Sequence, residues 1–250
     1  MKASVHVEYR DAAAHHWWFR ARRRIFARLL DPIAAPGGDA RILEVGPGSG
    51  VNVPILAPRG ELVVVDRDLG SLAACRAAGI AGVFADATRL PFADARFDLA
   101  CALDVIEHVD DDRAALRELH RVVRPAGHLL ATVPALRLLW GRQDVLAEHR
   151  RRYARREFAA ALEDSGFEIT RLSYFNTLLF PPILLTRLLM RPFLSRSLAT
   201  GRSDLAVRAP FGLDRVLEAL FAAEGAWLVR RDLPIGVSLL AIAKRKAAAT

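Results

Sequence analysis

Three glycines separated by single residues directly follow a short apolar run in this sequence. Gly46, Gly48 and Gly50 come after Ile42–Val45. Glycine tolerates positive φ and lets the backbone approach a ligand closely, so that exposed amides can bind the ligand's polar groups. A glycine-rich turn between a strand and a helix therefore indicates a pocket for a nucleotide-like molecule. A tight turn without any ligand is the alternative interpretation.

An acidic residue stands where such a pocket needs one. Asp66 ends the next apolar run, about twenty residues after the glycine turn, where a carboxylate can accept hydrogen bonds from both hydroxyls of a ribose. Asp66 could also cap the helix that is expected to begin near Ser71, because aspartate is a favoured N-cap residue. The two roles can coexist.

The elements that position these residues alternate between strands and helices. Apolar runs bounded by turn residues predict strands, and amphipathic segments such as Ser71–Ala78 and Asp111–Val123 predict the helices between them. Strands joined through helices favour a parallel, doubly wound sheet. The five predicted strands of this part are Arg41–Val45, Glu61–Val65, Gly82–Ala85, Phe97–Leu103 and His128–Val133.

The flanking parts of the chain follow a different order. Residues 10–30 predict an amphipathic helix, and Glu157–Ser165 predicts another before a sixth strand at Phe167–Leu172. A last strand is expected at Val237–Ala243, after a long connection whose pattern predicts helices. Within that connection the helix Leu213–Leu228 is expected to pack through one apolar face, formed by Val216, Leu217, Leu220 and Phe221.

Five motifs follow one another in order between about Ile42 and Val133. They are Glu44-x-Gly46-x-Gly48-x-Gly50, Asp66, Asp86-Ala87-Thr88-Arg89-Leu90-Pro91-Phe92, Phe97-Asp98-Leu99 with Asp104-Val105-Ile106-Glu107-His108-Val109, and Arg124-Pro125-Ala126-Gly127-His128-Leu129. The G-x-G-x-G spacing departs from the G-x-G-x-x-G of nicotinamide and flavin enzymes. Together the motifs resemble those of class I S-adenosylmethionine-dependent methyltransferases of the methyltransferase-domain-11 type, which includes the ubiquinone/menaquinone-methyltransferase-like enzymes, with Ala126 in place of the usual first glycine of the last motif.

The resemblance implies an α/β fold with a Rossmann-like, doubly wound sheet of seven strands. The sheet is mostly parallel, with the strand at Val237–Ala243 inserted antiparallel between the fifth and sixth strands. The expected organisation is an N-terminal helical lid at 1–36 and a cofactor-binding core at 37–172. A helical substrate cap at 173–234 and a last core strand with a basic tail at 235–250 complete it.

S-adenosylmethionine is the cofactor that the resemblance implies. In the family, an aspartate at the position of Asp86 and the next backbone amide face the adenine, and the acid at the position of Asp66 binds the ribose. The residues expected to contact the cofactor are Glu44, Gly46, Pro47, Gly48, Gly50, Asp66, Arg67, Asp86, Ala87 and Leu103.

Three residues are candidates for catalysis at the acceptor. A hydroxyl or amine acceptor must lose a proton, and histidine is the usual base, whereas a carboxylate or thiolate acceptor would need none. His108 follows the fourth strand, and His149 and Tyr153 lie in a segment that resembles the H-x-R-R-Y-T of related enzymes, with Ala154 in place of the threonine. A structural hydrogen bond is the alternative role of each histidine.

The arginines of that segment have two interpretations. Arg150, Arg151 and Arg152 form a run that Arg155 and Arg156 extend. A solvated basic face is one interpretation, and recognition of a phosphate or carboxylate on the acceptor is the other, because guanidinium groups bind such anions bidentately.

The amino-acid composition narrows the classes of binding partner but does not identify one. With 36 Lys+Arg against 28 Asp+Glu, the formal net charge is +8, which favours anionic partners or simply a solvated basic surface. No RNA-binding module is recognisable, so nucleic acid is not expected. The stretch 178–193 is apolar but is interrupted by Pro181, Pro182 and Arg187, so it suits contact with a membrane surface rather than a span.

The sequence thus predicts a methyltransferase that acts on a small acceptor, either lipid-like or anionic. An RNA or protein methyltransferase and a non-catalytic S-adenosylmethionine-binding protein are the alternatives. Cys75 and Cys101 lie far apart, so neither a disulfide framework nor a metal site is expected, and the cytoplasm is the expected compartment. The sequence leaves the oligomeric state open.

Overall fold

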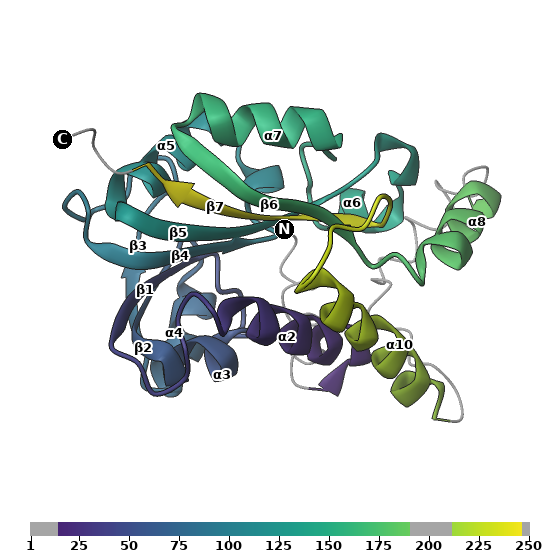
Figure 1. The fold of residues 1–250 in the computed structure, drawn as a ribbon, viewed down its shortest axis with the longest axis horizontal. Coiled ribbons are helices and arrows are strands. Elements are labelled where there is room, and N and C mark those ends of the chain that lie inside the picture. Colours follow the sequence, from purple (N-terminus) through teal and green to yellow (C-terminus); the bar gives the residue numbers. More distant parts are fainter. Residues whose placement is uncertain (1–14, 191–211, 247–250) are drawn as a thin grey trace.

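A seven-stranded sheet with the order β3-β2-β1-β4-β5-β7-β6 forms the centre of the computed structural model, which describes residues 15–190 and 212–246 (Figure 1). Within the described sheet, β7 runs antiparallel to both β5 and β6, and the other neighbours are parallel. The prediction of a Rossmann-like sheet with one inserted antiparallel strand is confirmed. The strands are β1 (Ala40–Val45), β2 (Gly60–Asp66), β3 (Ala81–Phe84), β4 (Phe97–Leu103), β5 (Val123–Pro134), β6 (Phe167–Phe175) and β7 (Ser238–Arg245).

Helices cover both faces of the sheet, which is why its central strands are almost wholly apolar. One face packs against α5 (Asp112–Val122) and α7 (Arg155–Asp164). The opposite face packs against four helices, and each face has its own buried apolar cluster. These four are α2 (Trp17–Leu30), α3 (Val53–Leu56), α4 (Leu69–Ala77) and α10 (Leu213–Leu228).

Two strands are longer than the sequence indicated, each by three residues or more. Strand β5 begins at Val123 instead of His128, because Val123 pairs with Phe97 before the register shifts around the Pro-Ala-Gly segment. Strand β6 continues to Phe175, since its last residue pairs with Ser238 at the start of β7. Both extensions depend on partners distant in sequence.

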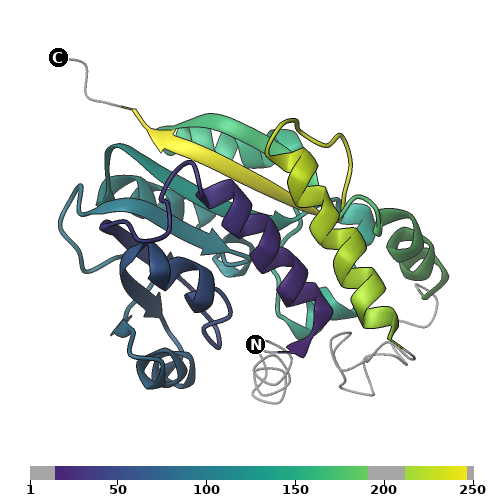
Figure 2. The same cartoon turned by 60° about the horizontal axis from the view of Figure 1, so that its bottom comes forward.

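Helices α2 and α10 lie side by side across one face of the sheet, although they come from opposite ends of the chain (Figure 2). Phe221 of α10 is fully buried and stacks on Phe175, with ring centroids 6.0 Å apart. Glu218 forms ion pairs with Arg20 Nε at 2.6 Å and Arg24 Nη2 at 3.0 Å.

The predicted apolar face of α10 was partly wrong. Phe221 is buried as expected, but Val216 is 52% exposed and Leu220 44% exposed. The helix instead turns two carboxylates inward, Glu218 toward the arginines of α2 and Glu224 toward the backbone of Leu178, whose amide donates to Glu224 at 2.7 Å. These polar contacts set the rotation of the helix.

Phe221 tests how much the contact between α2, α10 and β6 contributes to stability. Phe221→Ala leaves a cavity beside Phe175 and is expected to lower the free energy of unfolding by about 3–5 kcal/mol. Val216→Ala, on the exposed side of the same helix, is the matched control and should change it by less than about 1 kcal/mol. Urea unfolding followed by circular dichroism measures both, and equal effects would contradict this packing.

Candidate functional site

A cavity of about 1150 Å³ opens at the carboxyl ends of β1, β2, β4 and β5. This is the edge at which parallel α/β sheets bind ligands, because the loops that follow the strands converge there. The volume exceeds the roughly 300–1,000 Å³ of pockets that hold one drug-sized ligand. The cavity is therefore large enough for two molecules side by side.

The glycine turn after β1 forms one wall of the cavity. Gly46, Gly48 and Gly50 have φ of 66°, 55° and 77°, a region that favours glycine. A Cβ on Gly46 would lie 2.5 Å from Cγ2 of Val105, so only glycine fits there, whereas a Cβ on Gly48 would meet nothing within 4 Å. The turn thus packs against the loop after β4 on one side and leaves its backbone accessible from the cavity on the other.

Glu44 supports this turn from behind. Its carboxyl is buried, accepts a hydrogen bond from Asn52 Nδ2 at 2.8 Å through Oε1, and has no hydrogen-bond partner at Oε2. Burial raises the pKa of Glu44 to about 7; the bond from Asn52 lowers it and the charge of Asp66 raises it further. Neither Glu44 nor Gly50 borders the cavity, so any effect of these two residues on a ligand is indirect.

At the end of β2, the structure shows which of the two roles considered for Asp66, ribose binding or helix capping, another residue already fills. Asp68, not Asp66, caps α4, because its carboxylate accepts from the Ser71 amide at 2.9 Å. Asp66 borders the cavity; burial raises its pKa although backbone amides, including those of Asp68 and Gly48, hydrogen-bond to it and act in the opposite direction. Asp66 is thus free of the capping role.

The remaining predicted cofactor residues also border the cavity. Asp86 pairs with Arg67 Nη1 at 3.2 Å, and hydrogen bonds from the Thr88 amide and hydroxyl lower its pKa. Ala87 and Leu103 complete this part of the wall, together with Pro47. The structure brings together all the predicted residues except Glu44 and Gly50.

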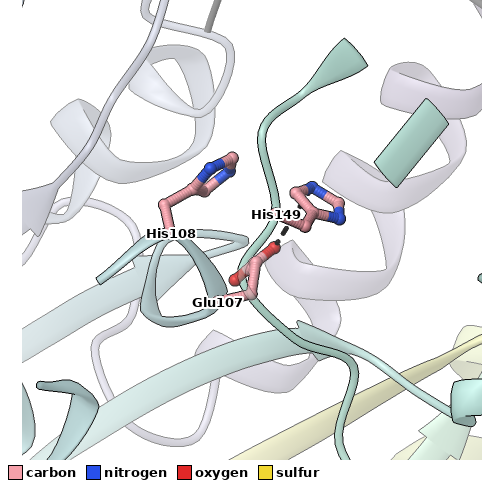
Figure 3. Close-up of side chains that lie close together, drawn as sticks. All are labelled: Glu107, His108 and His149. Carbon is pink, nitrogen blue, oxygen red and sulfur yellow. Dashed lines mark ion pairs between the residues drawn. The ribbon is translucent and has the colours of Figure 1, made fainter. Parts of the chain in front are cut away.

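The other end of the cavity contains a cluster of two histidines and a glutamate (Figure 3). Glu107 and His108 belong to η2 (Ile106–His108), directly after β4, and His149 comes from the loop after α6 (Arg142–Leu146). Glu107 and His149 point toward each other, with His149 Nε2 3.9 Å from Glu107 Oε1. Burial lowers the pKa of His108 to about 4, so this ring is neutral at pH 7.

His149 is oriented by a buried aspartate. Its Nδ1 lies 2.9 Å from Oδ1 of Asp144, which also accepts from Arg152 Nε at 2.7 Å. The second oxygen of Asp144 accepts from the Gly141 amide at 2.8 Å. Because this carboxylate stays ionised among such donors, it fixes the proton of the imidazole on Nδ1 and leaves Nε2 facing the cluster.

A second buried network joins the N-terminal helix to the site, and sequence reasoning missed it. Arg22 Nη1 lies 2.6 Å from Asp104 Oδ2, and Arg22 Nη2 donates to Thr132 Oγ1 at 3.0 Å. Burial would raise the pKa of Asp104, but the ion pair and the hydrogen bonds outweigh it and lower the pKa. Trp18 stacks on the Arg22 guanidinium at 4.2 Å. The sequence signal for this network was Asp104, the first residue of the Asp104–Val109 motif that follows β4.

Tyr153 is a correction to the predicted catalytic set. It does not border the cavity, and its hydroxyl donates to Asp112 Oδ2 at 2.7 Å inside the core. Burial, together with this bond, raises the pKa of Tyr153 above its usual range. The Tyr153 hydroxyl therefore lies outside the cavity and links α5 to the loop after α6.

The arginine run is largely neutralised by neighbouring carboxylates. Arg151 pairs with Asp112 at 3.0 Å and Arg152 with Asp144 at 2.7 Å. Arg150 pairs at 3.2 Å with the exposed Asp110 and borders the cavity, as Arg152 does. Anion recognition by the run would therefore compete with existing ion pairs.

Another part of the cavity wall is mostly apolar, although Arg22, Thr186 and Arg187 also border the cavity. Side chains of α2, α10 and α8 (Phe180–Met190) border the cavity here, next to the loop after β6. The cavity therefore joins a glycine turn, a polar cluster and an apolar surface. The apolar side chains are Trp17, Phe26, Leu179, Pro182, Ile183 and Leu217.

Comparison with known proteins gives a consistent result for the core. Residues 43–131 match the family model described as a methyltransferase domain. A demethylmenaquinone methyltransferase of Mycolicibacterium vanbaalenii is 38% identical over 115 residues, which are 46% of this chain and 47% of that relative. The chain thus spans about half the length of the curated relatives it matches.

Solved structures share the fold over most of the chain. An S-adenosylmethionine-dependent methyltransferase from Mesorhizobium loti superposes with a TM-score of 0.54 at 21% identity, over 87% of this chain and 96% of that one. The cyclase SpnF superposes with a TM-score of 0.59 at 19% identity, over 90% and 81%. At such identities the likeness shows the fold alone.

The matched segment contains the glycine turn and strands β2, β3 and β4, and the sheet around it has the expected seven-stranded order. Residues 43–131 of the chain thus match a methyltransferase domain, and this part is similar to demethylmenaquinone methyltransferases within a Rossmann-like fold.

Proposed function

We propose that this protein transfers a methyl group from S-adenosylmethionine to a small, amphipathic acceptor with a hydroxylated, quinone-like ring. The observation that carries the proposal is the single cavity that joins the glycine turn and Asp66 to the histidine cluster and the apolar wall. A donor and an acceptor held together in one cavity can react without the entropic cost of meeting in solution.

The part of the cavity bordered by the glycine turn, Asp66 and Asp86, here called the cofactor end, fits an adenosyl compound. The open backbone at Gly48 allows close approach, and Asp66, freed from capping, offers its carboxylate to ribose hydroxyls. In the family that the sequence resembles, the residues at the positions of Asp86 and Ala87 face the adenine, which supports the same role here. When bound, S-adenosylmethionine supplies a methyl group on a positively charged sulfur, which is already electrophilic. The protein's task is then to orient the acceptor and to exclude water.

The acceptor end fits a group that must lose a proton. His149 has its Nδ1 proton directed at Asp144, so Nε2 can accept a proton from an acceptor hydroxyl. His108 is neutral and borders the same part of the cavity. We propose His108 and His149 as the residues that handle the acceptor, without Tyr153.

The apolar wall and the relatives together suggest the acceptor class. Trp17, Leu179 and Ile183 offer a surface for an apolar ring or chain next to the polar cluster. The relatives, by their names, methylate demethylmenaquinone, which supports a quinone-like acceptor with an apolar tail.

We also propose that α2 is a lid and that α8 and α10 form a substrate cap. All three helices contribute side chains to the cavity wall. Helix α8 exposes Leu185, Leu188, Leu189 and Met190, a surface suited to contact with a membrane that supplies a lipid-like acceptor. No helix among the described residues is long and apolar enough to cross a membrane. Parts of the lid, the cap and the tail lie outside the described residues, namely 1–14, 191–211 and 247–250. The last three residues of the apolar stretch, 191–193, are among them.

Asp66→Asn tests the cofactor end. Losing charge-assisted hydrogen bonds to a ribose is expected to weaken S-adenosylhomocysteine binding about 10- to 100-fold. Calorimetric titration measures the affinity, with NAD as the competing ligand. Asp164→Asn, an exposed acid on α7 that pairs with Arg113, is the control and should bind as the unmodified protein does. Equal affinities for both variants, or tighter binding of NAD, would refute this assignment.

Glu44→Gln tests the buried carboxyl behind the turn. A folded-state pKa of about 7, above the ordinary 4.5, means that the protein holds a proton there which the unfolded chain releases. Stability from this group is complete below pH 4.5 and is lost as the pH rises through 7. Relative to the unmodified protein, Glu44→Gln should therefore gain stability between pH 4.5 and 8, by on the order of 3 kcal/mol.

Urea unfolding at pH 4.5 and pH 8 measures this difference. Glu163→Gln, at an exposed position on α7, is the control and should show no such gain. A constant difference between Glu44→Gln and the unmodified protein at both pH values would show that the carboxyl ionises normally.

The transfer reaction is tested with S-adenosylmethionine labelled in its methyl group. Cell extract incubated with the protein is separated into lipid, RNA and protein fractions, and we expect the label in the lipid fraction. His149→Ala should slow incorporation about 100- to 10,000-fold while S-adenosylhomocysteine still binds. His128→Ala, whose ring lies on β5 outside the cavity, should retain the rate. Label in RNA or protein would favour the rival functions, and no label would favour a non-catalytic binding protein.

A further inference from the structure

Glu107 is a buried acid without a counter-charge of its own. It is 0% exposed, and neither carboxyl oxygen has a hydrogen-bond partner on another residue. The nearby cations are already paired, Arg22 with Asp104 at 2.6 Å and Arg152 with Asp144 at 2.7 Å. Burying a carboxylate without partners costs free energy, so we expect Glu107 either to be protonated or to bind a cation.

The distance to His149 favours a cation. Nε2 of His149 is 3.9 Å from Oε1 of Glu107, too far for a direct hydrogen bond between a protonated acid and the imidazole. Nitrogen and oxygen ligands lie about 2.0–2.2 Å from a tetrahedral zinc ion, so two ligands of one ion are about 3.4 Å apart. Ligand atoms of Glu107, His108 and His149 all lie within 4.8 Å of one another, so binding an ion requires side-chain rotations that bring the widest pair up to about 1.4 Å closer.

Both imidazoles are held in the way that metal-bound histidines are. His149 is fixed through Nδ1 by Asp144, and the His108 ring hydrogen-bonds the backbone of Glu148. A metal-bound histidine typically donates its other N–H to a carboxylate or a carbonyl, which orients the free nitrogen toward the ion.

The backbone also fixes the two segments relative to each other. The amide of Arg150 donates to the carbonyl of Glu107 at 2.8 Å, and the amide of His149 donates to the carbonyl of Asp144 at 2.9 Å. The three side chains therefore approach one another on a preformed frame, although they come from two separate loops. Sequence spacing could not reveal such a site, and none was predicted.

We propose that Glu107, His108 and His149 bind a divalent transition-metal ion, with zinc as the best match, which keeps open coordination positions toward the cavity. Two imidazoles and one carboxylate are a donor set of open zinc sites and suit magnesium poorly. The role at the acceptor rests on the proposed function: the ion binds the acceptor's hydroxyl oxygen and lowers its pKa, and the proton passes to solvent. His149 then acts as a ligand of the ion rather than as the base.

Metal binding is measured directly by calorimetric titration of zinc chloride into tag-free protein that has been stripped with a chelator and dialysed. We expect one zinc ion per chain. Glu107→Gln and His149→Ala should each weaken binding by at least about 100-fold, and Asp144→Asn, which only loosens His149, by about 10- to 100-fold. His128→Ala, outside the cavity, should bind within about twofold of the unmodified protein.

Thermal melting of each variant establishes that it is folded, and His108→Ala replaces His149→Ala if the latter is not. Zinc binding that is absent from the unmodified protein, or that survives all of these ligand substitutions, would overturn the inference. S-adenosylhomocysteine binding is titrated on the same samples. If that binding persists while zinc binding fails, the metal site falls and the proposed function stands.

Discussion

The close contact between Gly46 and Val105 is the constraint on which the site depends. A Cβ at Gly46 would lie 2.5 Å from Val105, so glycine alone allows the turn after β1 to pack against the loop after β4. Val105 directly precedes η2, which carries Glu107 and His108. The same contact therefore sets the distance between the backbone that would hold a cofactor and the side chains that would handle an acceptor. Proximity of this kind, fixed before any ligand arrives, is a large part of what an enzyme for methyl transfer must supply.

Around this contact the protein buries several charged side chains. The pairs Arg22–Asp104 and Arg152–Asp144 are each neutral, and each brings a distant segment to the ends of β4 and β5. Glu107 lies near both pairs without a charge to balance it. Buried ion pairs contribute little net stability, and a lone buried acid lowers it. The stability of the fold comes from the two apolar clusters on the faces of the sheet. The buried charges are therefore better explained by a role in binding or catalysis.

The sequence predicted the sheet well because short apolar runs bounded by turn residues identify buried parallel strands. Phe97–Leu103 was predicted with the bounds that the structure shows. Where partners distant in sequence decide the outcome, prediction failed: β5 begins early because Val123 pairs with Phe97. Periodicity also misjudged α10, since it treats Glu218 as a surface residue and cannot anticipate the arginines of α2.

The candidate site divides in the same way. A local pattern, the glycines and Asp66 at the right spacing, predicted residues that mostly line one cavity, although it could not show that Glu44 and Gly50 do not border it. The acceptor end depends on how the loop after α6 folds back onto η2. That is why Asp144 was missed, and why the hydroxyl of Tyr153, which was predicted together with His149, bonds to Asp112 in the core.

The most direct measurement of the central claim is a crystal structure of the protein grown with S-adenosylhomocysteine. The account predicts the adenosyl group against the backbone of Gly46 to Gly48, with its ribose hydroxyls on the carboxylate of Asp66 and its sulfur directed toward the histidine cluster. A ligand bound elsewhere, or a cavity that takes up none at saturating concentration, would contradict it.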